Sequence, residues 1–365
     1  MTTRFRIDNV GSFLRPAEVR QAREELQQDR LTPEELRAIE DRAILSVLEM
    51  QQQVGLPVFT DGEFRRETFS TVVADAIEGF ATMSISREWR GRGDVVTEDR
   101  APIVVGKLHP KRRIVAHEAS FLKQHAPGPF KITLPTPNQF PDPGYRVGVS
   151  DQVYASRQEL LHDLAVIISE EVRALVEDGV NYIQLDAPRY SYFLDPVWRQ
   201  HLREAGVDLD QGLRAAIAAD NVCLQAAARP GVTRGFHLCR GNARSRWYAE
   251  GSYEAVAEAV FGGLDTDVFL LEYDSDRAGG FEPLRFVPRG KTVVLGLVTT
   301  KEPALERQDE LLRRIDEASR YVPMEDLALS TQCGFASGVA GNLLSHDDQR
   351  RKLELVVDAA RKAWA

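Results

Sequence analysis

The chain has 365 residues, a formal net charge of −9 and 43% hydrophobic residues, which is typical of globular domains. The acidic balance argues against nucleic acid as a partner, because neutralising phosphates requires a basic surface. The sequence contains no apolar run of ~20 residues, so we expect no membrane span, and its N-terminus lacks the apolar core of a signal peptide. Three cysteines are too few for a disulfide framework, which favours a cytoplasmic protein with free thiols.

Short apolar, β-branched runs recur along the chain, and each ends in polar residues. The eight runs cover residues 5–12, 56–63, 130–136, 181–187, 232–239, 267–273, 291–299 and 326–333. Such strands, separated by helices, are typical of a parallel sheet that is buried on both faces. Eight strand–helix units predict a single α/β domain over residues 1–365, a (β/α)8 TIM barrel. An open doubly wound sheet is the alternative, and a duplicated two-domain chain is disfavoured because no linker composition appears.

Helix signals lie between the runs. Thr32 is placed as a cap with Glu35 three residues later, which predicts a helix that ends at Gly55. The stretch 150–179 repeats apolar residues on one helical face, and the stretch 345–365 begins with acidic residues in its first turn. These helices are expected to cover the outside of the sheet.

One region interrupts this rhythm. Residues 84–128 lie between the second and third predicted strands, and the segments 94–108 and 112–118 within them have the composition of short β segments. We therefore expect an inserted β excursion on the barrel and no separate domain.

In a TIM barrel the active site is built at the C-terminal ends of the strands. The polar residues at those ends are Ser12, Asp61, Glu63, Thr136, Asp186, His237, Cys239, Glu272, residues 299–301 and Cys333. Because side chains alternate along a strand, His237 and Cys239 point to the same face. If that face is the interior, both residues could converge with Glu272 and Cys333 on one ion.

The types of these four residues match zinc, which accepts thiolate, imidazole and carboxylate ligands in a tetrahedron. Such a site would carry net negative charge and would suit the binding of a substrate thiol as an electron-rich thiolate. Glu272 is the ligand that we expect to yield to an incoming sulfur. The alternative is that His237 and Cys239 are ordinary core residues, as we expect of Cys223 in its helical stretch.

On these residues, the chain from "VGSFLRP" to the C-terminal helix resembles the catalytic barrel of cobalamin-independent methionine synthase. The order His-x-Cys, Glu, Cys matches the zinc ligands of that family. The resemblance implies Zn2+ held by His237, Cys239, Glu272 and Cys333. It also implies a 5-methyltetrahydropteroyltriglutamate–homocysteine methyltransferase-like transferase of methionine biosynthesis, which methylates the homocysteine thiolate.

The resemblance further implies that Ser12 contacts the carboxylate of the amino acid and that Glu63 and Asp186 hold its ammonium group. Each residue also has a structural interpretation. Ser12 could belong to a turn, Asp186 could cap a helix, and Glu63 could pair with Arg65 or Arg66.

The chain departs from the family in three respects. We expect the second, N-terminal barrel that helps hold the folate to be missing. The stretch "KITLPTPNQF" after the third predicted strand has no pterin-stacking tryptophan, although Phe140 is near. Lys301 occupies the position of a catalytic histidine, where it would act as a general acid or as a clamp for an anion. These differences leave the methyl donor open.

Short single-barrel relatives of the family define the alternatives. They include core methionine synthases and epoxyalkane:coenzyme M transferases, in which a zinc-bound thiolate opens an epoxide. Two carboxylates would repel the sulfonate of coenzyme M, so Glu63 and Asp186 favour an amino-acid thiol. A metal-free barrel similar to uroporphyrinogen decarboxylase and a non-catalytic binding barrel are the remaining alternatives. We expect a small-molecule thiol and an alkyl donor as partners, and the sequence leaves the oligomeric state and the pathway open.

Overall fold

The centre of the fold is a six-stranded parallel sheet in which consecutive strands are neighbours, in the order β3-β4-β5-β6-β7-β8. The computed structural model describes residues 5–365. The strands are β3 (Ile132–Pro135), β4 (Tyr182–Asp186), β5 (Thr233–Leu238), β6 (Val268–Glu272), β7 (Thr292–Val298) and β8 (Leu327–Thr331). Their side chains are almost all buried, as expected for a parallel sheet that is covered on both faces. The register pairs Asp186 of β4 with His237 of β5, which brings two predicted site residues together.

The first two predicted strands are not regular strands, and that part of the prediction is wrong. Residues 5–12 and 56–63 form only isolated parallel bridges, which are Ile7 with Leu329 of β8, Ser12 with Gly62, and Phe59 with Phe130. The backbone turns left-handed at Gly11 (φ +132°), Gly62 (φ +70°) and Glu63 (φ +59°), and such residues cannot continue an extended ladder. The bridges still place both segments along the path from β8 to β3.

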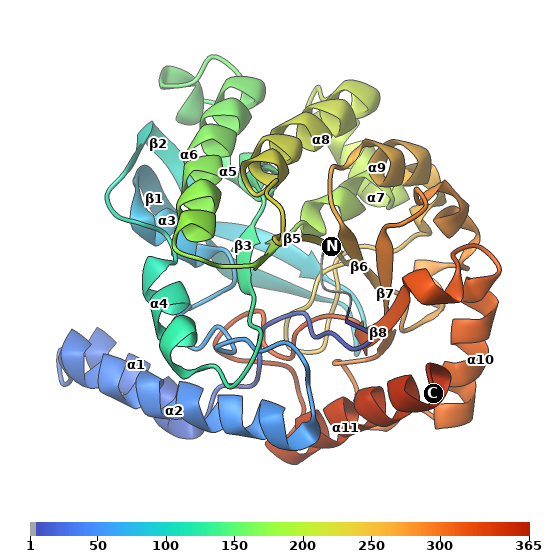
Figure 1. Ribbon diagram of the computed structural model, residues 1–365. Helices are drawn as coiled ribbons and strands as arrows, with labels where there is room; N and C mark the ends of the chain where they lie inside the picture. Colours follow the sequence, from blue (N-terminus) through green and yellow to red (C-terminus); the bar gives the residue numbers. More distant parts are fainter. Residues whose placement is uncertain (1–4) are drawn as a thin grey trace.

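Helices surround the sheet on the outside (Figure 1). They are α1 (Ala17–Gln27), α2 (Pro33–Val54), α3 (Thr71–Ala76), α4 (Ala116–His125), α5 (Pro141–Gly144), α6 (Arg157–Glu177), α7 (Pro196–Glu204), α8 (Leu209–Ala226), α9 (Ala257–Gly263), α10 (Gln308–Ser319) and α11 (His346–Ala363). The capping box predicted for α2 is present, since Thr32 and Glu35 exchange side-chain and backbone hydrogen bonds, and Gly55 ends the helix with φ +86°. Among residues 5–365, no helix has the length and apolar composition needed to cross a membrane.

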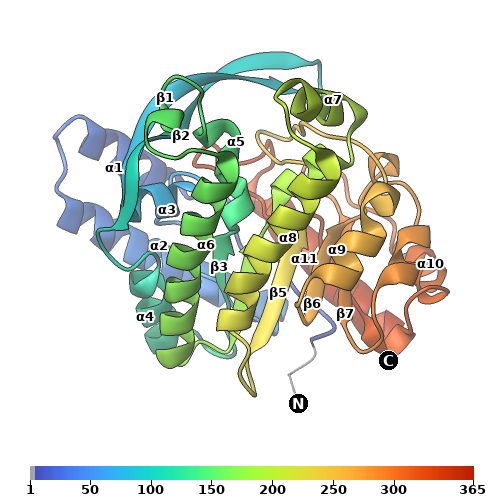
Figure 2. The same ribbon diagram turned by 90° about the horizontal axis from the view of Figure 1, so that it is seen from above.

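A long antiparallel hairpin precedes β3. It consists of β1 (Ile77–Trp89) and β2 (Val95–Pro110), and it arches over one end of the molecule toward α7 (Figure 2). The β segment expected at 112–118 is wrong, because residues 112–115 lead into α4 and residues 116–118 form its first turn. A short apolar run does not by itself distinguish a strand from a buried helix.

The tip of the hairpin is fastened to loops that follow three strands of the sheet. Arg90 pairs with Asp195 after β4 at 2.5 Å, and its backbone bridges to Trp247 after β5. Arg92 pairs with Glu302 after β7, also at 2.5 Å. The hairpin therefore lies across the carboxyl ends of the strands, where the sequence predicts the site.

Candidate metal and substrate site

Three of the predicted ligands meet at the carboxyl end of the sheet. His237 lies in β5, Cys239 follows that strand directly, and Cys333 follows β8. Their ligand atoms all lie within 4.8 Å of one another, and the Cys333 Sγ lies 3.5 Å from the His237 Nε2. All three side chains are buried, so the arrangement is a compact group of nitrogen and sulfur donors shielded from water.

The histidine is oriented for metal binding by a backbone contact. The His237 Nδ1 lies 3.1 Å from the carbonyl oxygen of Leu270 in β6. Because a carbonyl only accepts, Nδ1 carries the proton, and the Nε2 lone pair is left facing the thiols. In the neutral ring this tautomer leaves Nε2 as the nitrogen that can bind a metal.

The two thiols differ in acidity. The hydrogen bond with Cys333 lowers the pKa of the Cys239 thiol well below its usual range, although burial acts in the opposite direction. Burial raises the pKa of the Cys333 thiol well above its usual range. The contact between the two sulfurs favours the loss of one thiol proton in the pair, and one imidazole with two sulfurs is a donor set that fits zinc.

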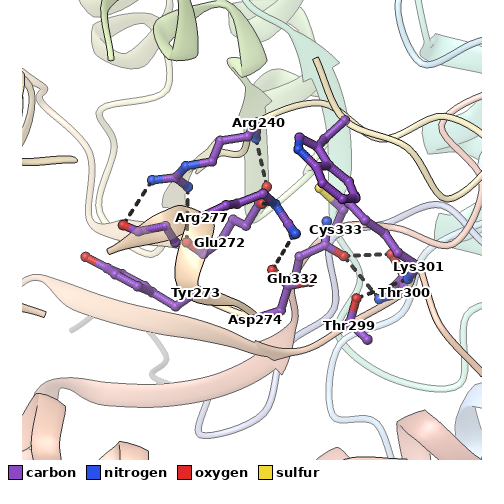
Figure 3. Close-up of polar contacts among 12 residues, drawn as sticks. Arg240, Glu272, Tyr273, Asp274, Arg277, Thr299, Thr300, Lys301, Gln332 and Cys333 are labelled. Atoms are coloured by element: carbon purple, nitrogen blue, oxygen red, sulfur yellow. Dashed lines mark hydrogen bonds and ion pairs between the residues drawn. The ribbon is translucent and has the colours of Figure 1, made fainter. Parts of the chain in front are cut away.

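Glu272, the fourth predicted ligand, is held by other groups. Its carboxylate accepts hydrogen bonds from the Arg240 backbone nitrogen at 2.7 Å and from the Arg277 Nε at 2.9 Å (Figure 3). Its side chain is fully buried at the end of β6. The structure brings three of the four predicted ligands together, and the role of Glu272 as a ligand stays a prediction.

Six of the eight predicted site residues line one cavity of about 80 Å³. They are Ser12, Glu63, Asp186, His237, Cys239 and Cys333. The three residues predicted to hold the amino acid therefore share a cavity with the three donors that meet. Glu272 and Lys301 do not belong to the described lining.

Glu63 has two features that are typical of a binding residue. Its backbone is in the left-handed region (φ +59°), which is uncommon for a residue with a side chain and is found where the surroundings enforce it. Its Oε1 accepts a hydrogen bond from the Thr133 hydroxyl at 2.9 Å and lies 3.6 Å from the Arg66 guanidinium. Its Oε2 is buried and has no partner among the described residues. A cation with hydrogen atoms to donate would satisfy that oxygen.

Asp186 and Ser12 complete this side of the cavity. Burial raises the pKa of the Asp186 carboxyl to about 7, and the Gln184 side chain donates to its Oδ1 at 2.7 Å. Ser12 is buried, and its Oγ accepts a long hydrogen bond (3.4 Å) from the Ala336 backbone nitrogen. Within residues 5–365 the Ser12 hydroxyl donates to no group, so its hydrogen can be donated to an acceptor in the cavity.

Lys301 is buried and bound to the loop that follows β5. Its Nζ donates to the Gly241 carbonyl at 3.1 Å and to the Asn242 Oδ1 at 2.9 Å. The adjacent Thr300 bonds to Gln332, next to Cys333 (Figure 3). Because Asn242 lines the cavity, the structure places Lys301 behind the wall of the site.

Several residues that line the cavity were not predicted from the sequence. Trp89 and Arg87 come from the hairpin, and Arg189 and Tyr248 come from the loops after β4 and β5. The tryptophan sought after the third strand is absent there, and Phe140 packs against Phe80 of the hairpin at 6.0 Å between ring centroids. Only the course of the hairpin brings Trp89 to the site, and no local sequence signal indicates that course.

Known proteins resemble this chain over almost its whole length. Residues 5–362 match the family described as "Cobalamin-independent synthase, Catalytic domain". The chain is 38% identical over 363 residues to the uncharacterized protein YxjH of Bacillus subtilis (strain 168), covering 99% of this chain and 95% of that protein. It is 24% identical over 357 residues to the methionine synthase of Saccharolobus solfataricus, covering 96% of this chain and 92% of that protein.

Two solved structures are similar along the whole chain. The "Putative Vitamin-B12 Independent Methionine Synthase" of Listeria monocytogenes has a TM-score of 0.76 and 29% identity, covering 100% of this chain and 99% of that one. A B12-independent methionine synthase from Shewanella sp. W3-18-1, in complex with selenomethionine, has a TM-score of 0.76 and covers 98% of this chain and 97% of that one. At 22% identity this second likeness shows the fold alone. Together with the match over residues 5–362, these findings show that the chain belongs to the family of cobalamin-independent methionine synthase-like catalytic domains.

Proposed function

We propose that this protein is a zinc-dependent methyltransferase that methylates the thiol of homocysteine to give methionine. The observation that supports it most directly is the shared cavity, in which a group of nitrogen and sulfur donors lies beside the predicted clamp for an amino acid. Membership of the family supports the same reaction class. The likeness to the Saccharolobus methionine synthase also supports it.

Zinc would be held by His237, Cys239 and Cys333, and we propose Glu272 as the fourth ligand. Glu272 forms an ion pair with Arg277, and to take that role its carboxylate would use a remaining lone pair for the metal. A bound zinc ion supplies one kind of chemistry here, which is to bind the substrate thiol and favour its thiolate form.

The protein's own residues would orient the amino acid. The unpartnered Oε2 of Glu63 and the carboxylate of Asp186 are suited to accept hydrogen bonds from the ammonium group. The Ser12 hydroxyl is suited to donate to the carboxylate. Holding both groups fixes the direction of the side-chain sulfur, and that positioning accelerates attack on the second substrate.

The reaction forms the S–CH3 bond of methionine and breaks the bond between the methyl carbon and the donor. The thiol loses its proton, and the leaving group of the donor takes up the bonding electrons. The cavity of about 80 Å³ is small, and the hairpin that carries Trp89 forms part of its wall. The donor would therefore approach beneath this hairpin.

The remaining expectations are proposals about the whole chain. We propose that residues 5–12 and 56–63, although they form bridges and not regular strands, close the sheet into a single barrel of the (β/α)8 type over residues 1–365, with the predicted excursion (84–128) as an insertion. The contacts of Lys301 support a role in positioning Asn242 over a role as general acid. A cytoplasmic location is proposed, and a small-molecule methyl donor is the proposed second partner.

Metal content and homocysteine binding test this function together, because neither depends on the identity of the donor. We expect about one zinc ion per chain in protein never exposed to chelator, and calorimetric binding of homocysteine. Cys239→Ser should lose both, whereas Cys223→Ser, a buried cysteine in α8, is the matched control and should keep both. Zinc binding unaffected by Cys239→Ser would contradict the proposal.

The reaction itself is tested with a panel of donors. Zinc-loaded protein, homocysteine and either methyltetrahydrofolate or methylcobalamin should give methionine with at least one donor. If homocysteine binds but no methyl donor in a wide panel reacts, methyl transfer is wrong although the thiol site is right. If an epoxide reacts in place of the methyl donors, the enzyme is an alkyltransferase.

A further inference from the structure

A chain of buried polar side chains leads from the N-terminal segment of the fold to Asp186. Its members are Asp8, Lys131, Gln184 and Asp186, and none of them exposes more than 6% of its surface. Gln184 and Asp186 belong to β4, where residues two apart point to the same face. Lys131 lies directly before β3, and the backbone of Asp8 is bonded to β8. Polar groups buried this deeply require hydrogen-bond partners, and those partners define the orientation of each side chain.

Lys131 fixes the orientation of the Gln184 amide. The Lys131 Nζ donates to the Gln184 Oε1 at 2.7 Å, to the Asp8 Oδ1 at 2.6 Å and to the carbonyl oxygen of Asn9. An ammonium group only donates, so the amide presents its oxygen to Lys131 and directs its nitrogen elsewhere. Asp8 balances the charge of Lys131, and its Oδ2 accepts from the Tyr182 hydroxyl at 2.7 Å. The orientation of the amide is therefore set by a buried ion pair.

The amide nitrogen of Gln184 has two acceptors close to the predicted amino-acid clamp. Its Nε2 donates to the Asp186 Oδ1 at 2.7 Å and to the carbonyl oxygen of Val10, two residues before Ser12, also at 2.7 Å. Among residues 5–365 the structure shows no hydrogen bond to the Asp186 Oδ2, and Asp186 lines the cavity. Because Oδ1 is occupied by the amide, Oδ2 is the oxygen that remains for a ligand.

We propose that Gln184, oriented by Lys131, is a positioning residue for the amino-acid substrate and acts through Asp186. This inference rests on the proposed homocysteine methyltransferase, because it assigns how the ammonium clamp of that enzyme is held. By occupying Oδ1, the amide keeps Oδ2 available to the ammonium group before the substrate arrives. A side chain that is already held in its binding orientation loses less conformational freedom when the ligand binds, which increases affinity and fixes the direction of the reacting sulfur.

The contribution of Gln184 is measured with two ligands, homocysteine and 4-mercaptobutyrate, which lacks the amino group. Gln184→Met removes the hydrogen bonds of the amide and keeps a side chain of similar length. We expect this variant to bind homocysteine ~10-fold more weakly, the effect of a lost hydrogen bond to a charged group, and to bind 4-mercaptobutyrate with a much smaller loss. Equal losses for the two ligands, or unchanged homocysteine binding, would overturn the proposal.

A double-mutant cycle tests whether Gln184 acts through Asp186. In protein that already carries Asp186→Ala, the second substitution Gln184→Met should cost no further homocysteine affinity, because the carboxylate that the amide positions is gone. Additive losses would show a general structural role and would contradict the proposal.

Tyr182→Phe is the matched control for the loss of a buried hydrogen bond. Tyr182 lies on the same face of β4 as Gln184, and its hydroxyl donates to Asp8. This variant should be less stable to denaturant and should bind homocysteine as the unchanged protein does. A loss of homocysteine affinity as large as that of Gln184→Met would show that any damage to this part of the interior weakens the site, which would refute a specific role of the amide.

The role of Lys131 is tested by removing its ion pair as a whole, because Lys131→Met alone would leave the buried Asp8 without its cation. Asp8→Asn combined with Lys131→Met removes both charges and keeps Gln184, so the amide is free to turn over. Homocysteine should then bind several-fold more weakly, and this variant keeps the proposal testable if Gln184→Met does not fold. Unchanged homocysteine binding would show that Lys131 does not set the orientation of the amide.

The side-chain amide of Gln184 also gives a readout that needs no ligand. In protein labelled with 15N in its glutamine side chains, the Gln184 signal is the one that Gln184→Met removes. Both of its hydrogens should exchange slowly with water, because both are donated to buried acceptors, and the signal should move in Asp186→Ala. Fast exchange, or a signal that stays in place, would contradict the proposed orientation. If the unchanged protein binds no homocysteine, the proposed function fails, and this signal still decides whether Gln184 holds Asp186.

Discussion

Replacing Glu63 by glutamine removes one negative charge from the predicted amino-acid clamp while keeping the size of the side chain. The Oε1 of the amide can still accept from Thr133. Arg66 remains paired with Glu118 at 2.5 Å, so the buried arginine keeps a carboxylate and the fold should persist. In Glu63→Gln the amide nitrogen would replace the unpartnered Oε2 and would face the substrate ammonium with a donor instead of an acceptor.

The expected loss follows from that single contact. A hydrogen bond to a charged group contributes about 1.5–3 kcal/mol, which corresponds to a roughly 10- to 150-fold weaker affinity for homocysteine. Isothermal titration of the zinc-loaded protein measures this loss without any methyl donor. Glu49→Gln on the exposed face of α2 is the matched control and should bind as the unchanged protein does.

A second ligand isolates the ammonium group. The compound 4-mercaptobutyrate keeps the thiol and the carboxylate of homocysteine but has no amino group. Glu63→Gln should bind this compound at least as well as the unchanged protein, because the missing charge has no cation to attract. Equal losses for both ligands would show that Glu63 supports the structure of the site and does not contact the ammonium. An undiminished affinity for homocysteine would refute the clamp itself.

Two further predictions concern stability and packing. Burial raises the pKa of Asp220, which accepts from Tyr190 at 2.8 Å, to about 8, so between about pH 4 and 8 the folded state holds a proton that the unfolded state releases. This group alone should lower the free energy of unfolding by about 1.4 kcal/mol for each pH unit by which the pH rises over that window. Denaturant titrations of Asp220→Asn should therefore show a flatter dependence of the free energy of unfolding on pH. The same pH dependence in the variant and in the unchanged protein would contradict the pKa shift. A Cβ on Gly334 would collide with the Ser12 hydroxyl, so Gly334→Ala should weaken homocysteine binding by about tenfold or more, whereas Gly262→Ala, which meets open space, should bind normally. Normal binding by Gly334→Ala would argue against a ligand contact through Ser12.

The six strands β3 to β8 could be predicted from sequence because each is a short apolar run that is buried on both faces. The first two runs have the same composition but do not form regular strands. Their course depends on left-handed turns at Gly11, Gly62 and Glu63, which apolar periodicity does not reveal. The positive φ of Glu63 accompanies a local hydrogen bond, in which its backbone nitrogen donates to the Asp61 Oδ1 at 2.9 Å, and apolar periodicity does not reveal that contact.

The group of metal-binding side chains could be predicted from the sequence for a similar reason. Strand alternation puts His237 and Cys239 on one face, and the ends of parallel strands bring Cys333 to the same edge. The position of Glu272 depends on Arg277 and on the backbone of Arg240, which are contacts made by loops. A sequence pattern assigns a residue to the end of a strand, but the partner that its side chain contacts there depends on the loops.

The arginine and tryptophan side chains that line the cavity could not be predicted from the sequence. Arg87 and Trp89 reach it only because the hairpin folds back across the carboxyl ends of the strands, anchored through Arg90 and Arg92. Arg189 lies close to Asp186 in sequence, yet its burial among tyrosines emerges only from the packed structure. Such long-range placement is what sequence periodicity leaves undetermined.

The most direct test of the proposed zinc-bound thiol is X-ray absorption at the zinc edge, recorded with and without homocysteine. We predict about one zinc ion per chain, bound by two sulfurs and one imidazole nitrogen from Cys239, Cys333 and His237, with a third sulfur joining when homocysteine is added. Protein never exposed to chelator that holds no zinc would contradict this prediction. So would a zinc ion whose sulfur coordination does not change when homocysteine is added.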